Sequence, residues 1–307
     1  MIFREICISL RKAPIFLRPY CKVALACAIV ATGLTAGESK NGWRLERSEN
    51  RELFAIPRPW THDFDDQTGP YRWGAVSATC EQGKSQSPID IVPSQAVGSA
   101  SAAPIVLNYP KTDLVIENTG HVIEVPYETN AFAMIEGTPY DLLQFHFHTR
   151  SEHALNGASY DLEVHFVHRA ASGRLAVLGY WIKGCNLLDT TCKSNPVLDE
   201  IFANAPELKG EKDTHKELNP FEFLPVLRTS TGGVLENYYS YEGSLTTPPC
   251  SEGVRWFVAK DVITVSNESL KKLRSIIGNF PLYKNFQFNY RTPQPLNNRE
   301  VRSFGSN

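Results

Sequence analysis

The sequence of 307 residues has almost no excess of charge, no internal repeat and no low-complexity block. Its formal net charge of −2 gives no case for nucleic-acid binding, which depends on clustered positive charge. One uncharged apolar run near the N-terminus, from Val23 to Ala36, is shorter than the roughly 20 residues that span a bilayer. We therefore expect no nucleic-acid partner and no stable membrane span.

Residues 1–37 have the three-part plan of a secretory signal. Five basic side chains against one acidic come first, the apolar run follows, and small residues come next. A membrane anchor is one alternative, but the apolar run is short. A lipoprotein attached through Cys27 is another, but the run continues past that cysteine. We expect cleavage near Ala36 or Gly37, and hence a secreted or periplasmic protein.

The chain beyond the signal has the composition of an ordinary globular protein, with 42% hydrophobic and 21% charged residues overall. Its length allows one large domain or two ordinary ones. Residues 38–59 are polar, mixed in charge and end in two prolines, which is typical of an exposed linker or propiece. We expect one domain over residues 60–302 and a short tail over 303–307.

Short strand-like segments dominate that domain. Residues 105–109, 114–117, 121–125 and 132–135 are separated by Pro, Asn and Gly, and 175–182 is an apolar run of the length found inside sheets.

Helices are few in the predicted secondary structure. One is expected over Pro196–Ala203, with proline at its first position. A second is expected over Ser269–Ile277, where Asn267 is a plausible cap and the leucines and isoleucines form one stripe. Many short strands and few helices predict a β-dominated fold.

One pair of strand-like segments carries an unusual set of histidines. Side chains alternate between the two faces of a strand, so His146 and His148 share a face, and His165 lies on one face of the next segment. His168 has the opposite parity and is not expected to join them. The residues from Thr149 to Ala158 suit a connecting loop. Antiparallel pairing of the two strands would bring three imidazoles together.

Three neutral imidazoles with an open fourth position make a catalytic zinc site. Zinc-bound imidazoles usually donate their second N–H to a carboxylate, amide or carbonyl. Gln144 and Glu163 each lie two residues before a histidine and on the same face. Zinc in such a site lowers the pKa of a bound water to about 7. The alternative is a buried polar cluster that binds no metal.

Five blocks of sequence resemble the α-class carbonic anhydrases and occur in that family's order. In chain order, they are Gln86–Ile91, Asn118–His121, Gln144–His148 with Ser151–His153 and Glu163–His168, Tyr241–Cys250, and Asn289–Arg291 with Gln294–Leu296 and Asn298-Arg299. The resemblance runs from about Trp60 to about Arg302. Carbonic anhydrase is also the enzyme for which the water pKa of about 7 is known, so that value belongs to the family.

This resemblance implies a fold and a reaction. The fold is α+β and β-dominated, a single domain with a central twisted, mostly antiparallel sheet of about ten strands and small peripheral helices. The reaction is the reversible hydration of carbon dioxide to bicarbonate and a proton by attack of a hydroxide bound to Zn2+, with weak esterase activity as a side reaction. Inhibition by sulfonamides and small anions is also implied.

The resemblance assigns roles beyond the histidine triad. It makes Thr246 the acceptor of a hydrogen bond from the hydroxide and the donor of one to Glu152. It makes His121 the proton shuttle, since an imidazole can relay a proton to buffer. The residues expected around the metal ligands are Gln144, Glu163 and Asn289. Without the resemblance, Thr246 would be interpreted as a turn residue and His121 as an ordinary surface histidine.

An apolar wall is implied for carbon dioxide, which is uncharged and forms weak hydrogen bonds. The matching residues are Val167, Val177, Leu245, Val254 and Trp256, with Thr247 on the bicarbonate side. The same residues would be apolar in any protein core, so the wall depends on the resemblance.

Some positions depart from the family's animal members. Judged by its spacing from Gly69-Pro70, Phe64 stands where a tyrosine of the cavity water network is usual. Glu124 stands where Asn or Gln is usual, Thr149-Arg150 replaces the Trp-Gly that often follows the second histidine, and Tyr290 stands for Trp. None of these changes removes a zinc ligand.

Four of the seven cysteines lie beyond the signal, and an even number favours oxidation outside the cytoplasm. Cys80 and Cys250 match positions that form a disulfide in secreted and bacterial members of the family. Cys185 and Cys192 are close enough in sequence to close a small local loop. The alternative is four free buried thiols.

Two functions of other classes remain open. An inactive carbonic-anhydrase-like binding module would typically lack a zinc histidine, whereas this chain retains all three. A different metalloenzyme on a β scaffold, such as a cupin-like oxygenase, would use a glutamate as a ligand to iron. The sequence does not distinguish a monomer from a homodimer, or decide whether the sequon at Asn267 is glycosylated.

Overall fold

The structure, a computed structural model, describes residues 34–39, 42–47, 59–98, 104–127, 130–185, 191–230 and 232–305. The chain divides into two compact units, Met1–Arg58 and Pro59–Asn307. In the first unit, β1 (Leu34–Ser39) and β2 (Gly42–Arg47) form an antiparallel hairpin, which the sequence analysis did not foresee. Apart from Pro59, the rest of the predicted signal and linker lies outside the described residues.

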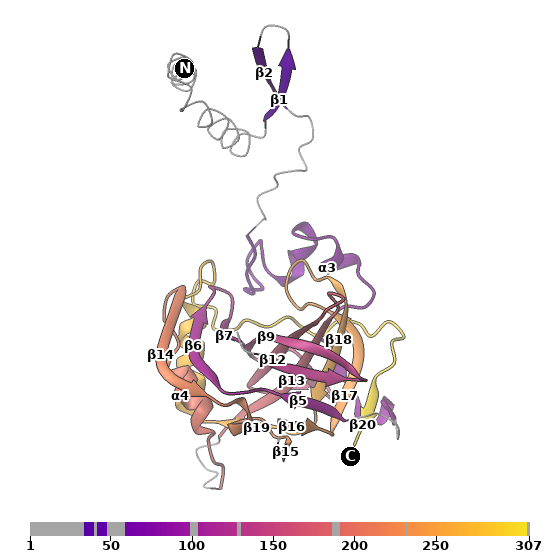
Figure 1. The fold of residues 1–307 in the computed structure, drawn as a ribbon, viewed down its shortest axis with the longest axis vertical. Coiled ribbons are helices and arrows are strands. Elements are labelled where there is room, and N and C mark those ends of the chain that lie inside the picture. Colours follow the sequence, from indigo (N-terminus) through magenta and orange to yellow (C-terminus); the bar gives the residue numbers. More distant parts are fainter. Residues whose placement is uncertain are drawn as a thin grey trace. The chain divides into compact units, whose positions relative to one another are not determined.

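The second unit is built on a mixed sheet of fifteen strands (Figure 1). Its strands are β4 (Val97–Gly98), β5 (Ile105–Asn108), β6 (Thr112–Asn118), β7 (Ile123–Pro126), β8 (Phe132–Ile135), β9 (Thr138–Thr149), β12 (Leu162–Ala170), β13 (Leu175–Gly184), β14 (Gly210–Leu218), β15 (Leu227–Thr229), β16 (Gly232–Leu235), β17 (Tyr238–Ser244), β18 (Glu252–Ala259), β19 (Ile263–Val265) and β20 (Arg302–Phe304). The main path runs β15-β16-β5-β8-β9-β12-β13-β18-β17-β20-β4.

Most neighbouring strands are antiparallel, and the parallel pairs are β13 with β18, β13 with β19, and β20 with β4. The expected β-dominated fold with a mostly antiparallel sheet is therefore confirmed, with fifteen strands in place of about ten. The five expected strands appear as β5, β6, β7, β8 and β13.

The connection after β9 is more ordered than the predicted loop. It contains β10 (Ala154–Leu155) and β11 (Ala158–Ser159), which form a separate three-stranded sheet with β3 (Asp90–Ile91). Asn156 and Gly157 turn the chain between β10 and β11 with φ of 51° and 78°, a conformation that these two residue types adopt readily.

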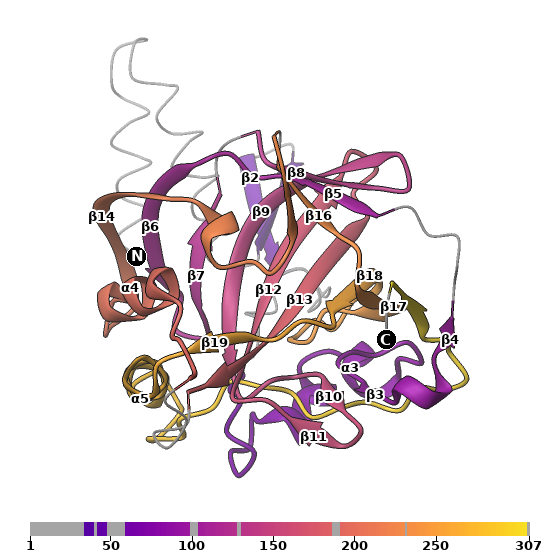
Figure 2. The same ribbon diagram turned by 90° about the horizontal axis from the view of Figure 1, so that it is seen from below.

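The described helices are small. They are α3 (Thr79–Gln82), α4 (Pro196–Asn204) and α5 (Asn267–Gly278), with 3-10 turns η2 (Pro70–Ala75), η3 (Pro93–Gln95) and η4 (Pro220–Glu222). Figure 2 shows α4 and α5 next to each other. None of the helices in the described segments is long and apolar enough to cross a membrane.

The predicted cap of α5 was wrong by one residue. Ser266 has an extended backbone and its hydroxyl accepts a hydrogen bond from the Ser269 N–H at 3.1 Å, so Ser266 is the cap. Asn267 is the first helical residue, and its amide nitrogen donates to the Cys185 carbonyl. That bond occupies the side chain of the glycosylation sequon.

The two faces of β9 and β12 separate core from site. Phe145, Phe147, Val164 and Phe166 are fully buried in the larger apolar cluster, as the alternation predicted. Their histidine neighbours therefore project from the opposite face of the same two strands.

Candidate metal centre

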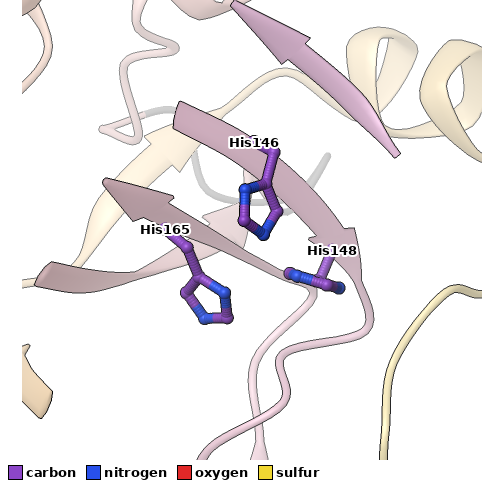
Figure 3. Close-up of side chains that lie close together, drawn as sticks. All are labelled: His146, His148 and His165. Carbon is purple, nitrogen blue, oxygen red and sulfur yellow. The ribbon is translucent and has the colours of Figure 1, made fainter. Parts of the chain in front are cut away.

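Strands β9 and β12 pair antiparallel, with His165 opposite His146 and Glu163 opposite His148. His146, His148 and His165 therefore point toward one another (Figure 3), and their ring centroids are 4.7–5.3 Å apart. One nitrogen from each ring lies within 4.8 Å of the other two. The structure thus brings the predicted triad together.

A hydrogen bond on the far side of each ring fixes its orientation. His146 Nδ1–H donates to Gln144 Oε1 at 2.9 Å, His148 Nδ1–H donates to the Asn289 carbonyl at 2.6 Å, and His165 Nε2–H donates to Glu163 Oε1 at 2.8 Å. Nε2 of His146 and His148 and Nδ1 of His165 are left with lone pairs that face inward. This donor set fits a tetrahedral zinc ion.

Asn289 was expected beside a ligand and is found there, but its backbone makes the contact. Its carbonyl accepts from His148, while its side-chain oxygen accepts from the Thr149 N–H at 2.7 Å and its amide nitrogen donates to the Phe147 carbonyl at 3.0 Å. Asn289 therefore clamps the end of β9.

The site favours neutral imidazoles and an ionised carboxylate. Burial, and then the neighbouring His148 and His165, lower the pKa of His146 well below its usual value. Burial also lowers the pKa of His148. Burial alone would raise the pKa of Glu163, but His153 and His165 outweigh burial and lower it. Neutral lone pairs beside a fixed negative charge are what a divalent cation requires.

Glu163 links the triad to a residue that the sequence analysis did not assign a role, His153. Glu163 Oε1 also accepts from His153 Nδ1 at 2.6 Å, and Oε2 accepts from the backbone N–H groups of Glu152 and His153 at 2.9 and 2.8 Å. His153 Nε2 lies 2.7 Å from the Tyr241 hydroxyl. A fully buried chain of bonds therefore holds the carboxylate in place.

Glu152 is fully buried beside the triad. Its Oε1 accepts from the Arg291 N–H at 2.8 Å, and its Oε2 lies 3.5 Å from His148 Nε2 and 3.8 Å from His165 Nδ1. Oε2 has no hydrogen-bond partner within the described part of the chain, so the expected bond from Thr246 is not formed here. Thr246 itself is almost fully buried.

Comparison with known proteins gives the family. Residues 68–305 match the family model of the eukaryotic-type carbonic anhydrases. The chain belongs to the eukaryotic-type carbonic anhydrase family. A carbonic anhydrase of Nostoc sp. is 35% identical over 242 residues, which cover 76% of this chain and 83% of the relative.

Solved structures agree with this assignment. The α-carbonic anhydrase of Thermovibrio ammonificans, in complex with the inhibitor sulfanilamide, has a TM-score of 0.68 and 38% identity, covering 80% of this chain and 98% of that chain. Dioscorin complexed with ascorbate also has a TM-score of 0.68, at 28% identity, covering 81% of this chain and 99% of that chain.

The residues expected to form the carbonic anhydrase apolar wall lie together. Val177, Val254 and Trp256 are buried in the second apolar cluster, and the partly buried Val167 and Leu245 pack against it. The Trp256 ring lies 4.8 Å from the His165 ring, measured between centroids. Thr247 follows Leu245 and Thr246 and is half-buried.

His121 lies in the turn between β6 and β7, where Gly120 has φ of 86°. Its ring stacks on Trp60 with centroids 4.0 Å apart. Burial, and then Lys209, lower the pKa of the His121 imidazole. On β7, where Glu124 is paired with His146 of β9, burial and Glu117 raise the pKa of the Glu124 carboxyl to about 7.

Both expected cysteine pairs form disulfides in the structure, Cys80 with Cys250 and Cys185 with Cys192. The first bond lies beside the site, because the Cys250 N–H donates to the Thr247 carbonyl at 2.8 Å. The Cys80 carbonyl accepts from Arg291 Nη2 at 2.8 Å.

His62, and not Phe64, is the residue of the N-terminal segment that reaches the triad. Phe64 packs against Tyr71, Phe286 and Tyr290. The fully buried His62 has its ring centroid 6.4 Å from that of His148, and burial lowers its pKa well below the usual value. Counting back from Gly69-Pro70 selected Phe64, because sequence spacing does not reveal how this segment folds back.

His168 lies on the opposite face of β12, as predicted, with Nε2 2.7 Å from the Tyr109 hydroxyl.

Proposed function

We propose that this chain is a zinc enzyme that catalyses the reversible hydration of carbon dioxide to bicarbonate and a proton. The observation that carries the proposal is the triad itself. Three inward lone pairs, each set by a hydrogen bond on the far side of its ring, converge within 4.8 Å on the face opposite the core.

The proposed zinc ligands are Nε2 of His146, Nε2 of His148 and Nδ1 of His165. A zinc ion held there would supply a Lewis acid that makes a nucleophile available near neutral pH. Gln144, Glu163 and the Asn289 carbonyl keep the three rings in the ligating tautomer.

The other site residues act on the nucleophile, the substrate and the proton. Thr246 is proposed to accept from the hydroxide and to donate to Glu152, whose Oε2 is free to accept. The apolar wall holds carbon dioxide without competing water. His121 carries away the proton that each turnover releases, since an imidazole can accept and give a proton near neutral pH.

An inactive binding module is the main alternative, because one protein of similar structure, dioscorin, was solved in complex with ascorbate. The retained triad argues against that alternative, since a module without catalysis has no need of three oriented ligands. An iron site with Glu163 as a ligand is disfavoured in this chain, because both oxygens of Glu163 already accept hydrogen bonds.

The two disulfides and the pattern of residues 1–37 support a secreted or periplasmic enzyme. The sulfanilamide complex of the Thermovibrio ammonificans relative supports sulfonamide inhibition here too. Weak esterase activity is a side reaction that the same nucleophile can support.

Stopped-flow hydration of carbon dioxide, with and without a zinc chelator, tests the proposal. We expect about one zinc per chain by metal analysis and loss of activity when the metal is removed. His148→Ala should lose zinc and hydration together. Full activity of metal-free His148→Ala protein would overturn the mechanism, and an inactive zinc-loaded wild type would favour the binding module.

A further inference from the structure

A fourth histidine, His62, lies beside the triad, and the proposed reaction does not use it. Its ring meets the rings of Trp60 and Trp73 edge-on, with centroids 5.3 Å apart in both cases, and its side chain is fully buried. The segment before η2 therefore places an imidazole against a metal ligand, His148, with no access to bulk water.

Three side chains that meet at this point supply three buried polar atoms without a hydrogen-bond partner in the described structure. They are His62 Nε2, His148 Nε2 and Glu152 Oε2. One ligand atom from each of the three residues lies within 4.8 Å of the others. Because Nδ1 of His62 is bonded to the Tyr283 hydroxyl, Nε2 is the nitrogen that faces the group. His148 Nε2 is a proposed zinc ligand, so His62 Nε2 and Glu152 Oε2 are the two atoms that remain without a partner.

Tyr283 determines which nitrogen of His62 carries the proton. The Tyr283 side chain is fully buried, and burial raises the pKa of its phenol, so the hydroxyl keeps its proton. Its partner among the described residues is His62 Nδ1. A buried O–H that lacks an acceptor costs free energy, so the phenol donates to Nδ1. The neutral imidazole then carries its proton on Nε2, which faces Glu152.

We propose that His62 is a positioning residue for Glu152, and that the two side chains hold one buried water between His62 Nε2–H and Glu152 Oε2. The water accepts from His62 and donates to the carboxylate. Two hydrogen bonds of about 2.8 Å that meet at a tetrahedral angle span about 4.6 Å. That span fits a group whose ligand atoms lie within 4.8 Å of one another. Buried waters characteristically join polar groups that lack other partners.

This water would complete the hold on Glu152. The Arg291 N–H already fixes Oε1, so a second bond on Oε2 stops the carboxylate from rotating and leaves its remaining lone pair for Thr246. The inference rests on the proposed function, because Glu152 affects the reaction through Thr246.

The first test reads the wild-type protein directly. A high-resolution crystal structure of the zinc-loaded protein should contain a water bonded to both His62 Nε2 and Glu152 Oε2. Long-range 1H–15N correlation spectra should assign the His62 proton to Nε2, and Tyr283→Phe should remove that preference. A dry gap between the two residues, or a proton on Nδ1 in the wild type, would overturn the proposal.

The second test separates positioning from packing. His62→Phe keeps a ring and removes the donor, whereas His62→Gln keeps an N–H donor. We expect His62→Phe to lower kcat/KM for carbon dioxide about threefold to tenfold, the loss that corresponds to one net hydrogen bond, with zinc content unchanged. His62→Gln should keep more than about half of the wild-type value.

Phe64→Leu is the matched control, because Phe64 belongs to the same segment and has no polar atom. It should leave kcat/KM unchanged. Equal losses in His62→Phe and His62→Gln would show a packing role and overturn the inference. If His62→Phe does not fold, the proposal is tested by the water in the crystal structure, by the His62 tautomer in the spectra and by the activity of His62→Gln. If the wild type is inactive but still shows the water and the Nε2 proton, the proposed function is rejected, whereas the inferred contact between His62 and Glu152 through a water is retained.

Discussion

The indole of Trp60 stacks on the imidazole of His121, with ring centroids 4.0 Å apart and ring planes inclined by 17°. From the other direction, Asn289 Nδ2 donates to the His121 carbonyl at 3.1 Å. Segments from near both ends of the catalytic unit therefore fix a histidine that local sequence alone would place on an ordinary surface turn. This fixed imidazole is the group proposed to carry protons away from the site.

His121→Ala should lower kcat in dilute buffer and leave kcat/KM nearly unchanged, because proton export follows bicarbonate formation and does not enter that ratio. Stopped-flow hydration across a buffer series measures both parameters. Added imidazole should restore much of the lost kcat, since it can accept the proton directly.

His215→Ala is the control, because His215 is exposed and lies on the edge strand β14. It should leave both parameters unchanged. If His121→Ala reduces kcat/KM as strongly as kcat and imidazole restores nothing, His121 has a structural role, and Glu124 becomes the first alternative for the proton.

Thr246→Val should have the opposite kinetic signature. The valine keeps the shape of the side chain and removes the hydroxyl that is proposed to join the nucleophile to Glu152. We expect kcat/KM to fall at least about tenfold, since an oriented hydrogen bond in the reacting state is lost. Thr246→Ser, which retains the hydroxyl, should recover most of the activity. Equal activity in the Val and Ser variants would remove Thr246 from the mechanism.

Glu163→Gln should weaken zinc binding, because Glu163 Oε1 accepts from both His165 and His153 and the substitution removes its charge. Partners of metal-bound imidazoles typically contribute about 10–100-fold in metal affinity. Competition with a chelator measures the change. Glu211→Gln, at an exposed position of β14, is the control. Unchanged zinc affinity in Glu163→Gln would show that the charge of Glu163 does not contribute to metal binding.

Strand alternation was sufficient to predict the triad. His146 and His148 on one strand and His165 on the next face the same side because side-chain direction repeats every two residues, and their buried phenylalanine neighbours confirm the alternation. The roles expected of Gln144 and Glu163 in orienting the rings follow from the same parity. The sheet's broad character also follows from the many short segments bounded by turn residues.

What the sequence concealed depends on tertiary contacts. His153 reaches Glu163 from the bend between β9 and β10, and His62 reaches the triad from a segment without periodic structure. Asn289 acts through its carbonyl, which any residue type would offer. Strands of two or three residues, such as β4 and β20, are too short to show an alternating pattern, so the sheet has more strands than expected.

His168 should make the stability of the protein depend on pH. Burial lowers the pKa of this imidazole to about 4, whereas an unfolded histidine titrates near 6.5. Between these values the unfolded chain binds a proton that the folded chain does not, so the free energy of unfolding falls as the pH is lowered from 6.5 toward 4. Above pH 6.5 this contribution to stability is fully present.

Urea unfolding at pH 4.5–8 would measure this effect, with wild type and His168→Gln compared in the presence of a chelator so that zinc release does not contribute. Below pH 6.5, the slope of the unfolding free energy against pH should be smaller in the variant. The difference should correspond to the uptake of up to about one proton on unfolding. Parallel profiles would mean that His168 titrates normally in the folded protein.

The Cys80–Cys250 bond should contribute more to stability than the Cys185–Cys192 bond. The first joins residues 170 positions apart and the second joins residues seven apart. Loop-closure entropy assigns roughly 5 kcal/mol to the longer loop and roughly half as much to the shorter, as upper estimates. Denaturant unfolding of the Cys80→Ser/Cys250→Ser and Cys185→Ser/Cys192→Ser double variants would compare them.

The longer bond should also affect catalysis. The Cys80 carbonyl accepts from the Arg291 side chain, and the Arg291 N–H holds Glu152. Loss of the bond therefore loosens a contact that leads to the site, and kcat/KM should fall in the Cys80/Cys250 variant at temperatures where it is still folded. The Cys185/Cys192 variant should keep wild-type kcat/KM, because the Cys185 carbonyl accepts from Asn267, the first residue of α5, which is not a residue of the site. Equal kcat/KM in both variants would mean that the Cys80–Cys250 bond only stabilises the fold.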